Sequence, residues 1–236
     1  MLAAGRGSPM TPAACVVVMA RRPRPGAVKT RLAAGLGETT ACLLYEAFLA
    51  DTLAACGEAS AVTIVACTPR AEIPWFRRFA PGALLTAQPE GSFGERLEAS
   101  MRAAFEAGFT RVAVLGSDVP HLGAGTIDGA LAAAGPGRAA LVPTVDGGYG
   151  LLALGSPEPR LFQDIEWSSG RELGQTVQRV RQLGLELVML PETFDIDTVA
   201  DLRRLTRALA RGEARCPRTA AVLARFASAP GVGLAS

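Results

Sequence analysis

The chain has 236 residues and a formal net charge of +2, and 49% of its residues are hydrophobic while 19% are charged. This length suits one large domain or two small ones, and the composition is that of a globular rather than a disordered protein. The near-neutral charge gives no general reason to expect binding to nucleic acid or to a membrane, so neither is predicted as a partner.

The five cysteines are scattered without C-x-x-C spacing, and the chain has one histidine. This pattern disfavours a zinc site and thiol–imidazole catalysis, so we expect reduced thiols. No apolar stretch reaches the ~18 residues of a membrane span. Residues 1–13 lack the apolar core of a secretory signal. We therefore expect a flexible lead at residues 1–13 and a cytoplasmic protein.

Short β-rich runs alternate with longer helical patterns along the chain. We expect strands at residues 15–20, 61–67, 83–87, 111–116, 139–144, 150–154 and 185–190. We expect helices at residues 38–56, 93–107, 124–134, 170–183 and 198–211. The alternation predicts a three-layer α/β/α domain with a mainly parallel sheet. We place this single domain at residues 14–212, before a C-terminal tail at residues 213–236 that has room for a short helix.

Four polar segments follow expected strands, at the sheet edge where such folds bind ligands. The first, RRPRPGAVKTRL at residues 21–32, carries five basic residues and no acid. Its Arg21, Lys29 and Arg31 are candidates for binding a phosphate. The segment matches neither the Walker loop nor G-x-G-x-x-G, and a solvated basic loop is the alternative.

The second segment, GSDVPHL, places Asp118 after the fourth expected strand. A carboxylate there can hold Mg²⁺ or Mn²⁺ bridging nucleotide phosphates, whereas the structural alternative is a turn or helix cap. We expect His121 on the same loop to be a bystander.

The third segment joins two expected strands through Asp146, Gly147 and Gly148. Asp-Gly is by itself a hairpin signal, and spacing alone favours that interpretation. In the functional interpretation, the two glycines let a ligand approach the backbone, while Asp146 and Tyr149 supply polar contacts.

The fourth segment places Asp195 and Asp197 after the last expected strand. Thr198 and Asp201 form a capping box for the next helix, which leaves the two earlier aspartates without a structural role. They fall on one side of an extended segment and are candidates for a second metal carboxylate.

Two further segments lie between these. Ser169 and Glu172 have capping-box spacing just after Trp167, which can stack on a sugar or base or can pack in the core. Gly91 and Gly94 fall at the start of an expected helix, whose N–H groups favour anions.

Taken together, these segments resemble a family of small bacterial transferases described as glycosyltransferases, some linked to arsenosugar biosynthesis and to radical-SAM gene neighbourhoods. The resemblance is carried, in family order, by MARRPRPGAVKTRL, LYEAFLADTL, GSDVP, DGGYG, IEW and DIDT, from about residue 16 to 205. VKTRL and DIDTVADL also resemble the 2-phospho-lactate guanylyltransferases. Ser92 and Phe93 stand where the family usually has an Asp-Leu pair, so position 92 offers no acidic side chain here.

The resemblance implies the nucleotide-diphospho-sugar transferase fold, type A of the glycosyltransferases. It implies that Lys29 and Arg31 bind nucleotide phosphates and that Asp118, with Asp195 or Asp197, binds a metal. The candidate site combines these residues with those chosen from the sequence pattern. Its catalytic candidates are Asp118 and Asp146; its phosphate-binding candidates are Arg21, Lys29, Arg31 and Gly94; its acceptor or sugar candidates are Gly147, Gly148, Tyr149 and Trp167; and its metal ligands are Asp118, Asp195 and Asp197.

Three functions remain open. The family resemblance favours glycosyl transfer from a nucleotide sugar to a small acceptor, with Asp146 as the candidate base. The basic segment also suits a nucleotidyltransferase that joins a nucleoside triphosphate to a phosphorylated small molecule. The third is a nucleotide-binding module without turnover. A homodimer is compatible with each.

Overall fold

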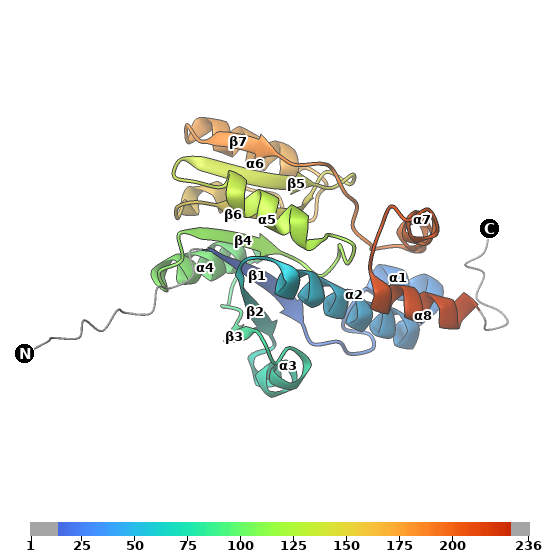
Figure 1. Ribbon diagram of the computed structural model, residues 1–236. Helices are drawn as coiled ribbons and strands as arrows, with labels where there is room; N and C mark the ends of the chain where they lie inside the picture. Colours follow the sequence, from blue (N-terminus) through green and yellow to red (C-terminus); the bar gives the residue numbers. More distant parts are fainter. Residues whose placement is uncertain (1–13, 228–236) are drawn as a thin grey trace, which may run out of the picture.

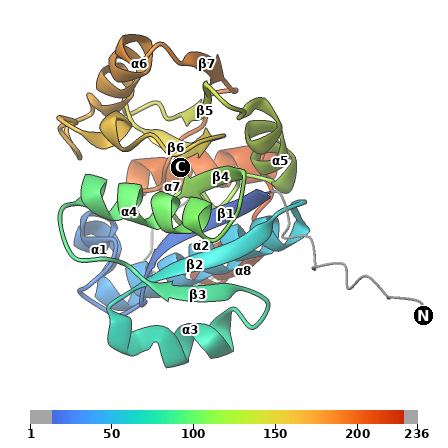
Figure 2. The same ribbon diagram turned by 90° about the vertical axis from the view of Figure 1, so that its left-hand side faces the viewer.

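The computed structural model describes residues 14–227, so the predicted flexible lead at residues 1–13 lies outside the described residues. One seven-stranded sheet has the order β3-β2-β1-β4-β6-β5-β7 (Figure 2). Its strands are β1 Ala14–Arg21, β2 Val62–Thr68, β3 Leu84–Ala87, β4 Arg111–Leu115, β5 Arg138–Pro143, β6 Tyr149–Leu154 and β7 Glu186–Met189. All pairings are parallel except those of β6 with β4 and β5.

Helices cover both faces of the sheet (Figure 1). They are α1 Thr30–Leu36, α2 Glu38–Glu58, α3 Ile73–Phe79, α4 Phe93–Glu106, α5 Ala124–Ala133, α6 Glu172–Gln182, α7 Val199–Ala210 and α8 Pro217–Ala227, with short 3₁₀ turns η1 Arg70–Glu72 and η2 Pro159–Phe162. One core cluster joins the sheet to α2, α3 and α5, and a second joins its other face to α4, α6 and η2. The expected three-layer α/β/α architecture is confirmed.

Strand β1 shows why its sequence is apolar throughout. Val16 and Val18 belong to the cluster on the α2 side, whereas Cys15 and Val17 belong to the cluster on the α4 side. All four side chains are buried, because a central parallel strand is covered on both faces. The two clusters together fix this strand in the middle of the sheet.

All seven expected strands and all five expected helices are present, with ends within a few residues of the predicted ones. Helices α1 and α3 were missed. Each is only seven residues long, and α3 carries Pro74 in its first turn, so neither gives a long periodic signal. The five cysteines are free and buried, as expected of reduced thiols.

Helix α2 is the one helix among residues 14–227 that is long and apolar enough to cross a membrane, by length and composition only. This differs from the expectation that no stretch reaches that length. However, 61% of its most apolar 18-residue stretch is buried inside the protein, as is typical of a core helix. The finding therefore gives only weak evidence for a span.

Helix α8 lies in the predicted C-terminal tail and packs on α2 (Figure 1). The buried carboxylate of Asp51 on α2 accepts hydrogen bonds from the N–H groups of Arg218 (3.0 Å) and Thr219 (2.8 Å). These are donors in the first turn of α8, which have no partner within the helix. The short helix foreseen in the tail is thus attached to the domain through Asp51.

The strand directions bring distant segments to one edge. Because β1, β4, β5 and β7 run parallel to one another, their carboxyl ends open on the same side of the sheet. The segments that follow them hold the basic residues 21–31, Asp118, the hairpin at 144–148 and Asp195 with Asp197.

Candidate functional site

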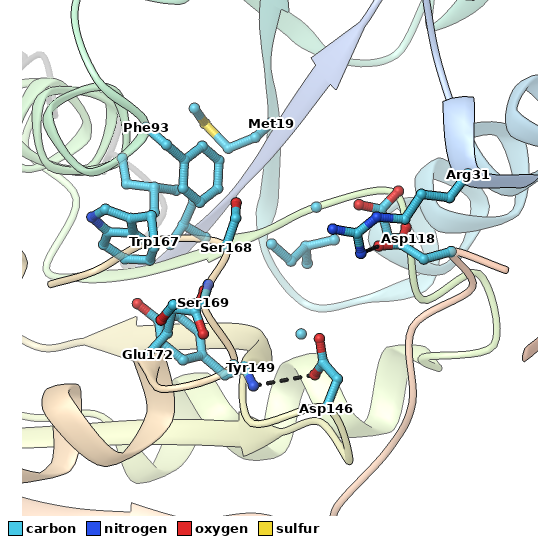
Figure 3. A pocket seen from close by; sticks show the side chains of 18 residues that line it. Met19, Arg31, Phe93, Asp118, Asp146, Tyr149, Trp167, Ser168, Ser169 and Glu172 are labelled. Atoms are coloured by element: carbon cyan, nitrogen blue, oxygen red, sulfur yellow. Dashed lines mark hydrogen bonds and ion pairs between the residues drawn. The ribbon is translucent and has the colours of Figure 1, made fainter.

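Two adjoining cavities open at the carboxyl edge of the sheet. The larger has a volume of 540 Å³ and lies between α4, the β5–β6 hairpin and the segment before α6 (Figure 3). The smaller has a volume of 280 Å³ and is lined by the basic segment and the loop after β4. Met19, Arg31, Asp118 and Asp197 line both cavities. The two cavities thus form one cleft with two ends.

The basic segment divides into two groups. Arg21, Lys29 and Arg31 line the smaller cavity. By contrast, Arg22 and Arg24 form ion pairs with Glu72. Only three of the five basic residues are therefore placed to meet an anion in the cleft.

Arg22 also has a packing role. Its guanidinium lies 3.9 Å from the ring centre of Trp75, and that ring stacks on Phe79 with a centroid distance of 4.4 Å. Such cation–aromatic contacts stabilise a structure modestly. Arg22 therefore ties the start of the basic segment to α3.

Lys29 lies between two of the predicted metal carboxylates. Its Nζ is 2.7 Å from Oδ1 of Asp118 and 2.8 Å from Oδ1 of Asp197, and its side chain is only 5% exposed. Burial would lower the pKa of Lys29, but the charges and hydrogen bonds of the two aspartates raise it above its ordinary value. Lys29 therefore remains charged. Arg31 extends the cluster, with Nη1 at 3.6 Å from Oδ2 of Asp197.

The backbone turns sharply at Lys29. It has φ 48° and ψ 48°, a left-handed conformation, and it stands at the N-terminus of α1. The buried Val28 precedes it. This turn directs the lysine stem inward while Arg31, on the first turn of α1, stays at the exposed rim.

Tyr45 and Ser117 line the smaller cavity and were not predicted there. The Tyr45 hydroxyl accepts from the N–H of Arg21 (3.1 Å) and donates to its carbonyl (3.2 Å). Burial raises the pKa of Tyr45, so its hydroxyl stays protonated. Tyr45 falls within an apolar helical pattern, which hides a polar role at the sequence level.

Asp146 is held by its own hairpin. Its Oδ1 accepts a hydrogen bond from Oγ1 of Thr144 (2.6 Å) and from the N–H of Gly148 (3.1 Å). The predicted β-hairpin is thus confirmed, with β5 and β6 antiparallel. Asp146 nevertheless lines the larger cavity together with Gly148 and Tyr149, so the same residues serve the turn and the cleft.

Gly147 occupies a position that tolerates no side chain. Its φ is +91°, and a Cβ added to it would lie 2.0 Å from the carbonyl oxygen of Gly170. Its carbonyl also accepts from the N–H of Leu173 at 2.9 Å. Gly147 therefore brings the hairpin into close backbone contact with the segment before α6. It is not among the described residues that line the larger cavity, so its predicted place in the acceptor or sugar site differs from its position in the structure.

The last two aspartates differ in their surroundings. Among the described residues Asp197, and not Asp195, lines the cavities. Burial raises the pKa of Asp195 to about 6, and the charges of Asp146 and Asp197 add to that rise. The two aspartates are thus electrostatically coupled, but only Asp197 faces the cleft beside Lys29.

Three aromatic side chains form the other end of the larger cavity (Figure 3). Trp167 meets Phe93 edge to face at a centroid distance of 5.2 Å and Tyr149 at 6.2 Å. Arg31 and Asp118 lie on the opposite side of the same cavity. Phe93 was not predicted as a site residue; it stands at the departure from the family's Asp-Leu pair and is 42% exposed.

Gly94 lies behind this aromatic group rather than at the end of the cleft that holds Lys29 and Arg31. A Cβ added to it would be 2.4 Å from Nε1 of Trp167, so the glycine lets the indole approach α4. The helix start is also already capped, because Ser92 and Glu95 form a capping box that sequence reasoning missed. A phosphate-binding role for Gly94 therefore finds no support in this geometry.

The two predicted capping boxes differ. Thr198 and Asp201 form theirs, as expected. The second capping box is incomplete. Oε1 of Glu172 accepts a hydrogen bond from the N–H of Ser169 (2.8 Å), but Oγ of Ser169 accepts one from the N–H of Arg171 (3.2 Å) rather than from Glu172. The reason is that α6 begins only at Glu172. Arg171 is the residue that precedes the helix.

His121 behaves as a structural residue. Its ring lies against Phe194 with a centroid distance of 4.4 Å, and Nε2 is 3.0 Å from Oγ1 of Thr193. Burial and the charge of Arg204 lower its pKa to about 4. His121 is therefore neutral at pH 7 and lies outside both cavities.

Over residues 14–227 there is no group of three or more His, Cys, Asp or Glu side chains arranged to hold a metal ion. The acidic pair in the cleft, Asp118 and Asp197, is smaller than that. Magnesium typically binds one or two carboxylates and completes its shell with water and substrate phosphates. Asp118 and Asp197, two carboxylates at a cavity of 280 Å³, match this coordination.

The fold matches several solved structures. A candidate nucleotide-diphospho-sugar transferase from Desulfovibrio desulfuricans G20 is 30% identical, with a TM-score of 0.84 over 92% of this chain and 96% of that one. A cytidylyltransferase from Leptospira borgpetersenii is 13% identical, with a TM-score of 0.55 over 95% and 98% of the two chains. A nucleotidyl transferase from Methanothermobacter thermautotrophicus is 14% identical, with a TM-score of 0.54 over 84% and 99%.

These likenesses define the class: the chain has the nucleotide-diphospho-sugar transferase fold and is a transferase-like enzyme, as the resemblance implies. The chain belongs to the family described as "Uncharacterized protein conserved in bacteria" (DUF2064), whose model matches residues 51–169. No curated protein matches it in sequence.

Proposed function

We propose that the protein transfers a glycosyl group from a nucleotide sugar to a small acceptor. The observation that carries the proposal is the two-ended cleft, with Lys29, Arg31 and two aspartates at one end and three aromatic side chains at the other. A nucleotide sugar has the same polarity, because a charged diphosphate is joined to a sugar that packs well on aromatic rings. The 30% identity to a candidate nucleotide-diphospho-sugar transferase supports this assignment.

In this reaction the bond between the sugar C1 and the diphosphate oxygen breaks, and C1 forms a bond to an acceptor oxygen. Charge then develops on the departing nucleoside diphosphate. Lys29 is charged and buried, and Arg31 can meet a phosphate with two parallel N–H donors. In the proposed reaction these two cations stabilise the leaving group.

The acceptor hydroxyl must lose a proton as it attacks. Asp146 is the candidate base, since it lines the larger cavity and only its Oδ1 is engaged by Thr144 and Gly148. Its Oδ2 has no hydrogen-bond partner among the described residues. A carboxylate in that position can accept the proton if the acceptor lies within hydrogen-bond reach.

Asp118 and Asp197 would hold the expected Mg²⁺ or Mn²⁺. A divalent cation bound there supplies further stabilisation of charge on the diphosphate. Lys29 neutralises part of the same acidic pair, which keeps the two carboxylates close together. Asp195 is the weaker candidate for a ligand because it lines neither cavity among the described residues.

A nucleotidyltransferase is the second candidate, favoured by the buried Lys29 at the smaller cavity. In-line attack on an α-phosphate needs charge neutralisation rather than a covalent nucleophile, and Lys29, Arg31 and a metal would provide it. The two reactions differ in what leaves: a nucleoside diphosphate in glycosyl transfer, and pyrophosphate in nucleotidyl transfer.

The test follows product release with Mg²⁺, offering a panel of nucleotide sugars and a panel of nucleoside triphosphates, with extract of the host cells as the acceptor source. Release of a nucleoside diphosphate from one sugar donor supports the proposal. It should fall at least about a hundredfold in Asp118→Asn. Asp164→Asn, at an exposed surface aspartate, is the matched control and should keep full activity.

Pyrophosphate release from a triphosphate, lost in Asp118→Asn, would replace the proposal with nucleotidyl transfer. Tight nucleotide binding without either product would favour a non-catalytic binding module. A nucleotide-sugar donor also agrees with the expected cytoplasmic location, which remains a proposal together with the homodimer.

A further inference from the structure

The aromatic end of the larger cavity contains a buried carboxylate that the proposed reaction does not use. Glu172, the first residue of α6, lines the cavity and is 7% exposed (Figure 3). Its Oε1 accepts from the N–H of Ser169 at 2.8 Å. Its Oε2 has no hydrogen-bond partner among the described residues. Because Glu172 lines the cavity, this free carboxylate oxygen can accept a hydrogen bond from a ligand there.

The charge on the wall of the aromatic end is negative. Among the described residues that line the larger cavity, Arg31 is the one cation, and it lies at the opposite end beside Asp118 (Figure 3). Arg171, next to Glu172 in the chain, is exposed and pairs with Glu166. Arg96 lies 5.9 Å from the ring centre of Phe93 but is not a lining residue. Glu172 is thus the dominant charge at the aromatic end.

The remaining wall of this end is apolar or neutral. Phe93 and Trp167 offer ring surfaces, and the segment from Ser168 to Gly170 offers hydroxyl and backbone groups. Ser168 has φ +62°, a left-handed conformation that is uncommon for serine. Neutral donors and acceptors around one carboxylate suit a ligand with several hydroxyl groups and no negative charge.

We propose that Glu172 makes this end of the cleft select an uncharged, hydroxyl-bearing sugar and reject an acidic one. Its carboxylate accepts hydrogen bonds from sugar hydroxyls, whereas the carboxylate of a uronic acid, or a phosphate, meets a like charge without a cation among the described residues that line this end. Specificity is then set by a repulsive element as well as an attractive one. This inference rests on the proposed function, because it names the sugar class for the same cleft.

The inference also bears on the second candidate function. A phosphorylated acceptor, as a guanylyltransferase-like reaction requires, would place its phosphate at one end of the cleft while the nucleotide phosphates occupy the other. Glu172 disfavours that arrangement at the aromatic end. Selectivity for neutral ligands therefore distinguishes the two reactions.

The experiment measures binding by calorimetry to the full-length protein with Mg²⁺. UDP and GDP are titrated first, followed by the pairs UDP-glucose with UDP-glucuronate and GDP-mannose with GDP-mannuronate. Each pair differs only by oxidation of one hydroxymethyl group to a carboxylate. On the base that binds, we expect the neutral sugar nucleotide to bind at least tenfold more tightly than its acidic partner.

Glu172→Gln removes the charge but keeps an oxygen for the Ser169 hydrogen bond. In this variant the preference should shrink to about threefold or less. Glu166→Gln, at the exposed carboxylate of the same segment, is the control and should keep the native preference.

Equal or tighter binding of the acidic sugar nucleotide to the native protein would overturn the inference, as would a preference that persists in Glu172→Gln. The native comparison needs no variant, so it stands even if Glu172→Gln folds poorly. If UDP and GDP bind but the sugars are not discriminated, only this inference fails. If neither diphosphate, nor any of the four sugar nucleotides, nor any other nucleotide sugar of the release-assay panel binds, the proposed function fails and this inference with it.

Discussion

Gly94→Ala should push Trp167 out of the wall of the cleft. The added Cβ would lie 2.4 Å from Nε1 and 3.0 Å from Cε2 of the indole, whereas ordinary contact begins at 3.4 Å. The ring must therefore retreat by about 1 Å, or α4 must shift by as much. Overpacking of this kind costs about 1–3 kcal/mol of stability. A displacement of about 1 Å in a substrate-positioning group can reduce turnover by about a hundredfold.

The assay uses the fluorescence of Trp167 in a Trp75→Phe background, which leaves one tryptophan in the chain. Gly94→Ala should shift the emission toward that of an exposed indole and weaken nucleotide-sugar binding, while binding of the nucleoside diphosphate alone changes little. Gly125→Ala, where an added Cβ has no neighbour within 4 Å, is the matched control. Unchanged emission and sugar affinity in Gly94→Ala would refute the assigned role of this glycine.

Three further predictions concern stability. The pKa of His121 is about 4 in the folded state, whereas its ordinary value is 6.5. Between these two pH values the unfolded state therefore binds more protons than the folded state. The free energy of unfolding should rise with pH across this window, by up to about 3 kcal/mol. The difference between the native protein and His121→Gln in denaturant titrations at pH 4 and 7 measures this contribution, and an equal difference at both pH values would contradict it. Asp51→Ala should destabilise the protein by about 2 kcal/mol, because two donors of α8 lose their acceptor, whereas exposed Glu213→Ala should change stability by less than about 0.5 kcal/mol. Gly147→Ala should lower the Tm clearly more than Gly37→Ala. Both glycines have a positive φ, but only at Gly147 would the added Cβ lie against backbone atoms. Equal losses of Tm would show that the backbone strain of a positive φ is the whole effect.

The sequence contained enough information to predict the sheet and the edge where the cleft lies. Runs such as the one from Cys15 to Ala20 are apolar throughout because both faces of the strand are buried, and this signal is local. The position of Asp118 and Asp197 at one edge follows from the parallel order of the strands. Both features can be predicted without knowing which side chains far apart in the sequence contact one another.

Other features depend on contacts that sequence patterns do not encode. The ion pair between Lys29 and Asp197 joins residues 168 positions apart. Glu172 reads as part of a capping box, and nothing in its neighbours in the chain indicates that it is buried in a cavity wall. In the sequence Gly94 falls at the start of an expected helix, whereas in the structure it accommodates the indole of Trp167, from a segment about seventy residues later.

The most direct test of the two-ended cleft is a crystal structure of the protein with Mg²⁺ and the nucleotide sugar that the release assay selects. We expect the diphosphate within hydrogen-bond distance of Lys29 and Arg31, and the sugar between Trp167 and Asp146. A diphosphate bound outside the cleft, or a sugar on the side of Lys29, would contradict the assignment of the two ends.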